Sequence, residues 1–279
     1  MALFLPPALL LFTIFVVLPI GEAAFLGFFK WNGYGEVTNF IGLKNYERLI
    51  GNRVFKSALF NTGLVIAVSL LVQLPLALGM ALFLAQKVRG AYLFRTIFFL
   101  PFILAEVATG LIWRFLYDGE FGLVAAIWGA LGAEAPFVLA ERELAMYAIM
   151  AVVVWKYFGF HMMIYIAGLQ NIPRDLIDAA RVDGATRWQI TRYVTLPLLK
   201  PTIMISVFFA VLGSLQLFDL VMPLTGGGPS NSTHTIVTYL YTFGIVRLRI
   251  GFGSAVGVVL FFICLAFALM YRRNLFARN

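Results

Sequence analysis

The sequence predicts an all-α, polytopic membrane protein with six transmembrane helices. Of the 279 residues, 62% are hydrophobic and 12% are charged, whereas soluble domains are closer to half apolar and a quarter charged. Six apolar runs reach the roughly 20 residues that a spanning helix needs, and none shows the period-two alternation of a transmembrane β-strand. We therefore expect one membrane domain over residues 1–279, with six spans at 3–29, 57–85, 93–117, 144–169, 202–224 and 253–271.

The first three spans differ in how they begin. The first run is too long for a cleaved signal peptide and lacks a basic start, so we expect a retained span that its three prolines bend. The second follows an amphipathic stretch at residues 44–56, which suits the outer membrane interface. The third carries Glu106 near its middle and leads into a loop where residues 121–128 predict a short interfacial helix.

The last three spans also contain polar residues. Lys156 lies midway along the fourth span, Gln216 lies deep in the fifth, and Asp219 lies near its outer end. The sixth ends at Arg272 and Arg273, which we expect to anchor it at the cytoplasmic interface. Ionisable residues at membrane depth are costly, so Glu106 and Lys156 are functional candidates.

The charges give a topology and exclude some partners. Six spans place both termini on one side, with eleven Lys and Arg residues there, including Lys87, Arg89 and Arg278, and nine on the other side. This small bias favours cytoplasmic termini. The net charge of +8 is read as loop charge near anionic lipid and not as affinity for nucleic acid. The lone Cys264 excludes an internal disulfide and a cysteine-based metal cluster.

Residues 169–201 form a charged island between the fourth and fifth apolar runs. It holds five basic and three acidic residues and must lie outside the bilayer. Pro173 ends the preceding helix or starts the next one, and Gly184 permits a sharp change of direction. The pattern predicts two short helices at an angle, with apolar side chains beside charges, a shape suited to a groove on a cytoplasmic partner.

The spacing within this island resembles the "EAA loop" of ABC importer permeases. That pattern is Glu-Ala-Ala, three residues, Gly, nine residues, Ile, one residue and Leu-Pro, and the sequence matches every spacing, with Asp178 for Glu and Val194 for Ile. Weaker matches elsewhere, such as Leu100-Pro101, resemble carbohydrate permeases of the maltose-permease type. The resemblance implies the type I permease fold and a cytoplasmic ATPase-docking loop at 170–201. Its docking set is Asp178, Ala179, Ala180, Asp183, Gly184, Val194, Leu196 and Pro197.

The resemblance also implies partners for this chain. A second permease subunit would complete the pathway, two ABC ATPase subunits would bind ATP and Mg, and an extracytoplasmic binding protein would deliver a sugar, oligosaccharide or polyol. The chain itself contains no Gly-x-x-x-x-Gly-Lys-Ser/Thr motif. It is therefore expected to be a non-enzymatic, multi-pass subunit of the cytoplasmic (inner) membrane without a cofactor or metal.

Alignment to that family implies a set of substrate-binding residues. Glu106 and Phe102 are four residues apart and share a helix face, as do Lys156 and Phe160. Carboxylate, ammonium and amide groups would bond sugar hydroxyls, and aromatic faces would cover the ring. A purely structural Glu106–Lys156 pair is the alternative. The full set is Phe102, Glu106, Lys156, Tyr157, Phe160, Gly213 and Gln216.

Two other functions compete with this interpretation. An ion-coupled secondary carrier would use buried acids such as Glu106 for coupling, but such carriers usually contain internal repeats, and the sequence shows none. A membrane-embedded enzyme would need a polar catalytic set. The isolated His161 and His234 do not provide one, and each is expected to be structural.

Overall fold

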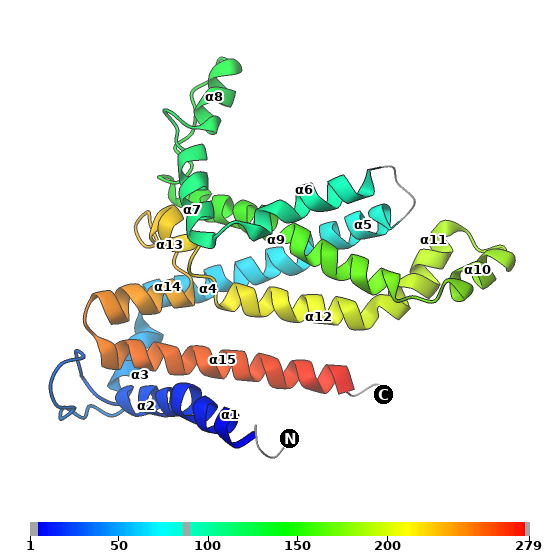
Figure 1. Cartoon of the computed structure of the whole chain (residues 1–279). Coiled ribbons are helices and arrows are strands. Elements are labelled where there is room, and N and C mark those ends of the chain that lie inside the picture. The colour runs from blue at the N-terminus through cyan, green and yellow to red at the C-terminus, as the bar shows by residue number, and fades with distance from the viewer. Residues whose placement is uncertain (1–4, 86–89, 277–279) are drawn as a thin grey trace. The chain divides into compact units, whose positions relative to one another are not determined.

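The computed structural model describes residues 5–85 and 90–276, and most of these are helical. Five helices are long and apolar enough to cross a membrane, and a sixth span results if one sharply bent pair is counted as one. Counted in this way, the helices correspond to the six predicted spans, and Figure 1 shows their arrangement along the chain. Lys87, Arg89 and Arg278, used above for topology, lie outside the described residues. The chain divides into two compact units, Met1–Asn61 with Gly226–Asn279, and Thr62–Thr225.

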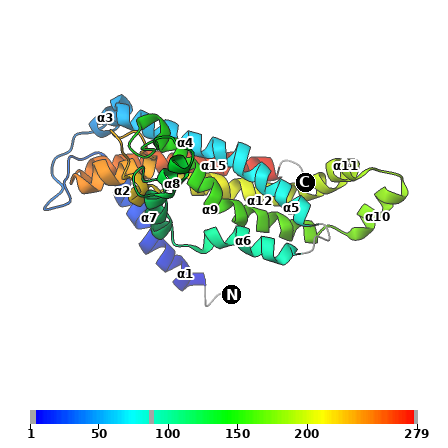
Figure 2. The same ribbon diagram turned by 90° about the horizontal axis from the view of Figure 1, so that it is seen from above.

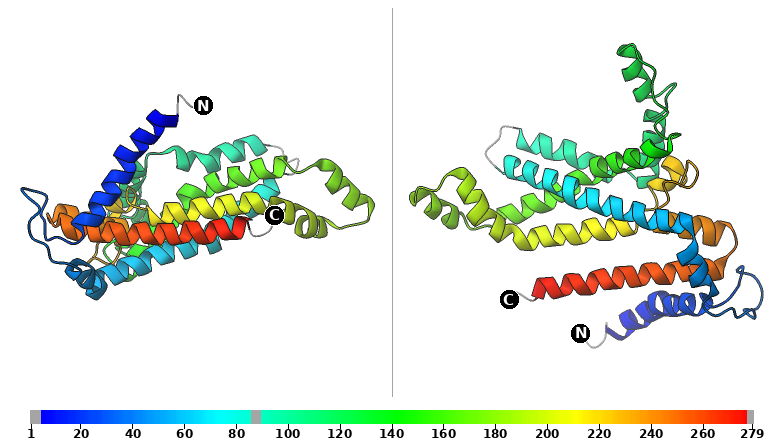
Figure 3. Two further views of the ribbon diagram at one scale, coloured as in Figure 1. Left: turned by 90° about the horizontal axis from the view of Figure 1, so that it is seen from below. Right: turned by 180° about the vertical axis from the view of Figure 1, so that it is seen from behind.

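The first unit is built on the two terminal spans. The first consists of α1 (Leu5–Phe12), a π-helical segment η1 (Thr13–Val17) and α2 (Leu18–Leu26), and the last is α15 (Ile250–Phe276). The carboxyl end of α2 packs against the start of α15, and the two spans diverge from there (Figure 3). The remaining pieces are α3 (Lys44–Gly51), the start of α4 (Arg53–Val68), α14 (Ile236–Leu240) and η4 (Tyr241–Val246).

Buried side chains hold this unit together. Its core contains Leu49, Phe55, Tyr239 and Phe243 among others. The predicted amphipathic stretch is largely α3, and its Asn45 donates to the carbonyls of Gly27 and Phe29, each at 2.9 Å. The Asn45 side chain therefore replaces helical hydrogen bonds where α2 ends and the chain turns.

The second unit is organised around one long central helix, α9 (Arg142–Gln170). It packs against α5 (Leu74–Leu84), α6 (Ala91–Ile103) and α12 (Leu196–Leu215), and α7 (Glu106–Leu116) packs on α13 (Val221–Thr225). The predicted interfacial helix of the third loop is α8 (Leu123–Ala130). At the far end, α10 (Arg174–Val182) and α11 (Arg187–Ile190) extend beyond α9 and α12 (Figure 2).

Three spans contain a π-helical segment followed by Leu-Pro. These segments are η1, η2 (Ser69–Gln73) and η3 (Thr191–Thr195), which precede Pro19, Pro75 and Pro197. Proline lacks the N–H of a helical bond and its ring crowds the preceding turn. A π-segment relieves that crowding by widening the turn. The prolines therefore adapt these spans without ending them.

Two predicted spans have the wrong shape or bounds. The third is not one straight helix, because α6 and α7 are bent by 98° at Leu104 and Ala105, which have extended backbone. The fifth was predicted at 202–224 but runs over Arg187–Leu215. Its start extends through Pro197 and Pro201, since η3 accommodates the first of them. Its end comes at Gln216, whose ψ of 6° leaves the helical range.

Candidate functional site

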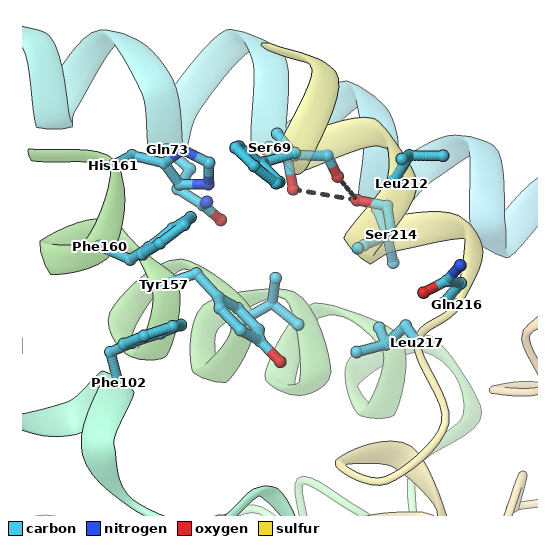
Figure 4. Close-up of a pocket in the computed structure, with 15 residues that line it drawn as sticks. Ser69, Gln73, Phe102, Tyr157, Phe160, His161, Leu212, Ser214, Gln216 and Leu217 are labelled. Atoms are coloured by element: carbon cyan, nitrogen blue, oxygen red, sulfur yellow. Dashed lines mark hydrogen bonds between the residues drawn. The ribbon is translucent and has the colours of Figure 1, made fainter. Parts of the chain in front are cut away.

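A cavity of about 330 Å³ lies within the second unit. Its walls come from α4 with η2, from α6, from α9 and from α12 and the residues just after it (Figure 4). This volume falls in the range of about 300–1,000 Å³ typical of small-molecule sites. Its aromatic and polar lining comprises Ser69, Gln73, Phe102, Tyr157, Phe160, His161, Phe209, Ser214 and Gln216, with Gly213 beside them.

Most of the residues predicted to contact substrate line this cavity. Phe102 from α6 and Phe160 from α9 stack with ring centres 4.6 Å apart and an interplanar angle of 19°. Tyr157, Gly213 and Gln216 complete the predicted part of the lining. Residues from three helices that are far apart in the sequence are thus brought to one place, and aromatic rings form one wall of it (Figure 4).

Glu106 and Lys156 are not among the residues that line the cavity. Lys156 is 1% exposed, and its Nζ donates to the carbonyl oxygen of Leu104 at 2.6 Å. Glu106 accepts a hydrogen bond of 2.5 Å from the hydroxyl of Tyr157. Within residues 5–85 and 90–276, the ion pair found is Arg181–Asp178, so the two groups are close but not in contact as an ion pair. Their role in substrate binding stays a prediction.

Several cavity residues were not predicted from the sequence. Gln73 and Ser69 lie in η2, four residues apart, and Gln73 is only 2% exposed. Its Oε1 has no hydrogen-bond partner among the described residues. Ser69 Oγ lies 3.4 Å from Ser214 Oγ. Two polar residues at helical spacing in an apolar run are the signal that could have identified them.

His161 has both a structural contact and a place on the cavity wall. Its Nδ1 lies 2.7 Å from Ser206 Oγ, which joins α9 to α12, as expected for a structural histidine. It also lines the cavity beside Gln73 (Figure 4). Across residues 5–85 and 90–276 there is no group of three or more His, Cys, Asp or Glu side chains placed to hold a metal ion.

The predicted docking segment has the two short helices that the sequence indicates. Gly184 between them has φ +81°, and Thr186 begins α11 with a capping box to Gln189. Asp178 and Arg181 form an ion pair of 2.7 Å on the exposed surface of α10. This segment also has exposed apolar side chains: Val182 is 88% exposed, and Leu176, Trp188 and Tyr193 are exposed as well. Val194, Leu196 and Pro197 lie in the following η3 and the start of α12.

Comparison with known proteins identifies the family. The chain is 34% identical over 278 residues to the diacetylchitobiose uptake system permease protein of Streptomyces coelicolor, covering 95% of this chain and 79% of that one. It is 31% identical to the trehalose/maltose transport system permease protein of Thermococcus litoralis, covering 95% and 90%.

A solved bacterial ABC transporter involved in the import of the acidic polysaccharide alginate contains a chain of the same fold. The TM-score is 0.83 at 25% identity, and the match covers 98% of this chain and 94% of that chain. Residues 73–278 match the family described as "Binding-protein-dependent transport system inner membrane component". The chain therefore belongs to this family and is a multi-pass inner-membrane permease subunit of an ABC importer, a transport component and not a catalytic one.

Proposed function

We propose that this permease imports a carbohydrate, and that the solute passes through the cavity between α4, α6, α9 and α12. The relatives above are permeases for diacetylchitobiose and for trehalose or maltose. A carbohydrate presents hydroxyl groups around rings with apolar faces, so its site needs hydrogen-bonding groups beside aromatic surfaces. The cavity has both.

The observation that carries this proposal is the carboxamide of Gln73. Its Oε1 is buried and unpartnered among the described residues, which is unfavourable by about 1–3 kcal/mol unless a partner arrives. A hydroxyl donor would remove that cost. The aromatic rings of Phe102, Phe160 and Phe209 line the same cavity and suit the apolar face of a sugar ring.

The experiment is uptake by the complete importer in vesicles with Gln73 replaced. Gln73→Leu should raise the solute concentration for half-maximal uptake about tenfold, consistent with one lost hydrogen bond. Gln73→Glu keeps a hydrogen-bond acceptor and should raise this concentration less than Gln73→Leu does. The control is Thr96→Leu, at an exposed position of α6 that is not among the cavity residues and whose hydroxyl donates to Tyr92 O of its own helix. Equal uptake in Gln73→Leu and the wild type for every carbohydrate tested contradicts the proposal.

We further propose that residues 170–201 dock an ATPase subunit, that the importer contains two such subunits, which bind ATP and Mg, and that both termini of this chain are cytoplasmic. A second permease subunit and an extracytoplasmic binding protein complete the importer. The exposed apolar side chains of α10 and α11 support a protein contact, because such side chains are poorly placed in water. An acidic first turn at Asp175 and the Asp178–Arg181 pair flank them.

Reconstitution separates this proposal from an ion-coupled carrier. This chain alone in vesicles should neither transport solute nor hydrolyse ATP, whereas the complete importer should require ATP and no ion gradient. Solute-specific flux through the isolated chain, or uptake that depends on an ion gradient, contradicts the heteromeric importer.

A further inference from the structure

The break in the third span leaves polar backbone groups inside the second unit. The last carbonyls of a helix have no partner within it, and they carry a partial negative charge. Here α6 ends at Ile103, the chain continues extended through Leu104 and Ala105, and α7 begins at Glu106 after a 98° bend. Two helix ends therefore meet where backbone groups must be satisfied by other parts of the chain.

Lys156 of α9 meets the carboxyl end of α6. Its Nζ lies 2.6 Å from Leu104 O, 3.4 Å from Pro101 O and 3.5 Å from Thr109 Oγ1. An ammonium has three donors, and each has an oxygen in this set. A buried ammonium is unfavourable unless it is hydrogen-bonded and electrostatically compensated. The negative end of α6 supplies both.

The next residue of α9 meets the other half of the break. Tyr157 donates to Glu106, which occupies the first turn of α7, where the helix dipole favours an acid. Consecutive residues of one helix therefore bind the carboxyl end of α6 and the amino end of α7. Thr109 Oγ1 also bonds Ala105 O at 3.0 Å, which ties α7 back to the break.

A close approach of two helix backbones makes this contact possible. At Gly159, one turn along α9 from Lys156, an added Cβ would lie 1.8 Å from the carbonyl oxygen of Phe98. The backbone of α6 thus lies directly on α9 there. From this position the lysine side chain reaches the end of α6.

We propose that Lys156 is a positioning residue, whose ammonium binds the free carbonyls at the end of α6, holds the third span broken at Leu104, and so sets Phe102 on the cavity wall. Phe102 is in the last turn of α6 and stacks on Phe160, which is one turn along α9 from Lys156. The consequence for solute rests on the proposed function of the cavity; the consequence for the break does not.

The bend can be measured directly in the assembled importer. Spin labels are placed at Ile97 on α6 and Leu111 on α7, both 53% exposed, after Cys264→Ala removes the native thiol. Pulsed electron resonance then gives the distance between the two halves. Lys156→Met should shift or broaden the distance distribution, because it removes every donor. Lys156→Arg keeps donors and should retain the wild-type distribution, as should Lys56→Met at an exposed position of α4.

The outcomes separate the positioning role from the function of the cavity. An unchanged distance in Lys156→Met overturns the proposal; if that variant does not assemble, Lys156→Gln is judged by the same criterion. Failure of Lys156→Arg to assemble, or to retain the distance, also overturns it. In Lys156→Met, half-maximal uptake should need roughly tenfold more solute, as for one charge-assisted hydrogen bond. A shifted distance with unchanged uptake of every carbohydrate leaves the positioning role standing and rejects the cavity as the solute site.

Discussion

The hydroxyl of Tyr157 lies 2.5 Å from the carboxylate of Glu106 and donates to it, which joins α9 to the first turn of α7. Hydrogen bonds to a charged group contribute about 1.5–3 kcal/mol. The bond also orients two residues predicted to recognise substrate, and Tyr157 itself lines the cavity. Variants that keep or remove this hydrogen bond therefore test the predicted role of Glu106 more sharply than removal of its charge alone.

Replacing Glu106 should affect uptake more than assembly. We expect Glu106→Ala to assemble nearly normally, with strongly reduced uptake or an altered preference among solutes. Glu106→Gln keeps an acceptor for Tyr157 and should retain more uptake than Glu106→Ala. Subunit recovery on gels and initial uptake rates measure the two effects. If the double variant Glu106→Ala/Lys156→Ala regains uptake, the two residues are only scaffolding and the solute binds elsewhere.

Gly159 should tolerate no side chain. Because a Cβ there would lie 1.8 Å from Phe98 O, a backbone atom that cannot turn aside, Gly159→Ala should separate α6 from α9. Overpacking typically costs about 1–3 kcal/mol, and we expect the upper end of that range. Gly79→Ala in α5 is the control, since nothing lies within 4 Å of its added Cβ. Thermal unfolding of the purified importer compares them, and an equal midpoint for both variants would refute the close approach.

Gly184 should be replaceable only by a residue that accepts a positive φ. Its φ is +81°, and no atom lies within 4 Å of an added Cβ, so backbone strain alone decides the result. Strain of this kind costs about 1–3 kcal/mol. Gly184→Val should uncouple ATP hydrolysis from uptake while leaving membrane insertion intact, and Gly184→Asn should be milder because Asn tolerates this conformation. The ratio of ATP hydrolysed to solute imported is the measurement.

The same loop tests the topology. A cysteine at Ala179, in a chain with Cys264→Ala, should react with an impermeant thiol reagent only from the cytoplasmic side. Inside-out vesicles and intact cells supply the two arms. Labelling confined to the outside of intact cells would invert the topology and remove the basis for ATPase docking.

His234 should make the segment of residues 226–240 sensitive to pH. Burial, and then the charge of Arg247, lower the pKa of His234 below its usual value near 6.5. The folded segment thus keeps the imidazole neutral, between Thr238 Oγ1 at 3.2 Å and Asn231 Oδ1 at 3.3 Å. Its contribution to stability is complete above about pH 6.5 and declines as the pH falls toward the lowered pKa. Protection of the backbone amides of residues 226–240 against hydrogen exchange, corrected for the intrinsic pH dependence of exchange, should fall over that interval and should not change with pH in His234→Gln.

The sequence alone determined the membrane class, the six spans and the two short helices around Gly184, because each rests on local information. A run of about 20 apolar residues is sufficient to identify a span. The two helices around Gly184 follow from a turn residue, caps and charges that lie within one short segment. The family was also accessible, since its motif has fixed spacing along the chain.

Only the tertiary structure decided where the third span breaks and which residues form the cavity. Residues 93–117 read as one apolar run, and Leu104 carries no signal of its own. The carbonyl of Leu104 at the break accepts a hydrogen bond from Lys156, which is 52 positions away in the sequence. Likewise, Gln73 lies in the π-helical segment η2. The wider turn of this segment changes which residues of the span face the cavity. Hydropathy records how much of a helix is apolar. It does not show which distant residue forms the hydrogen bond that a buried polar group needs, because that depends on how segments far apart in the sequence pack together.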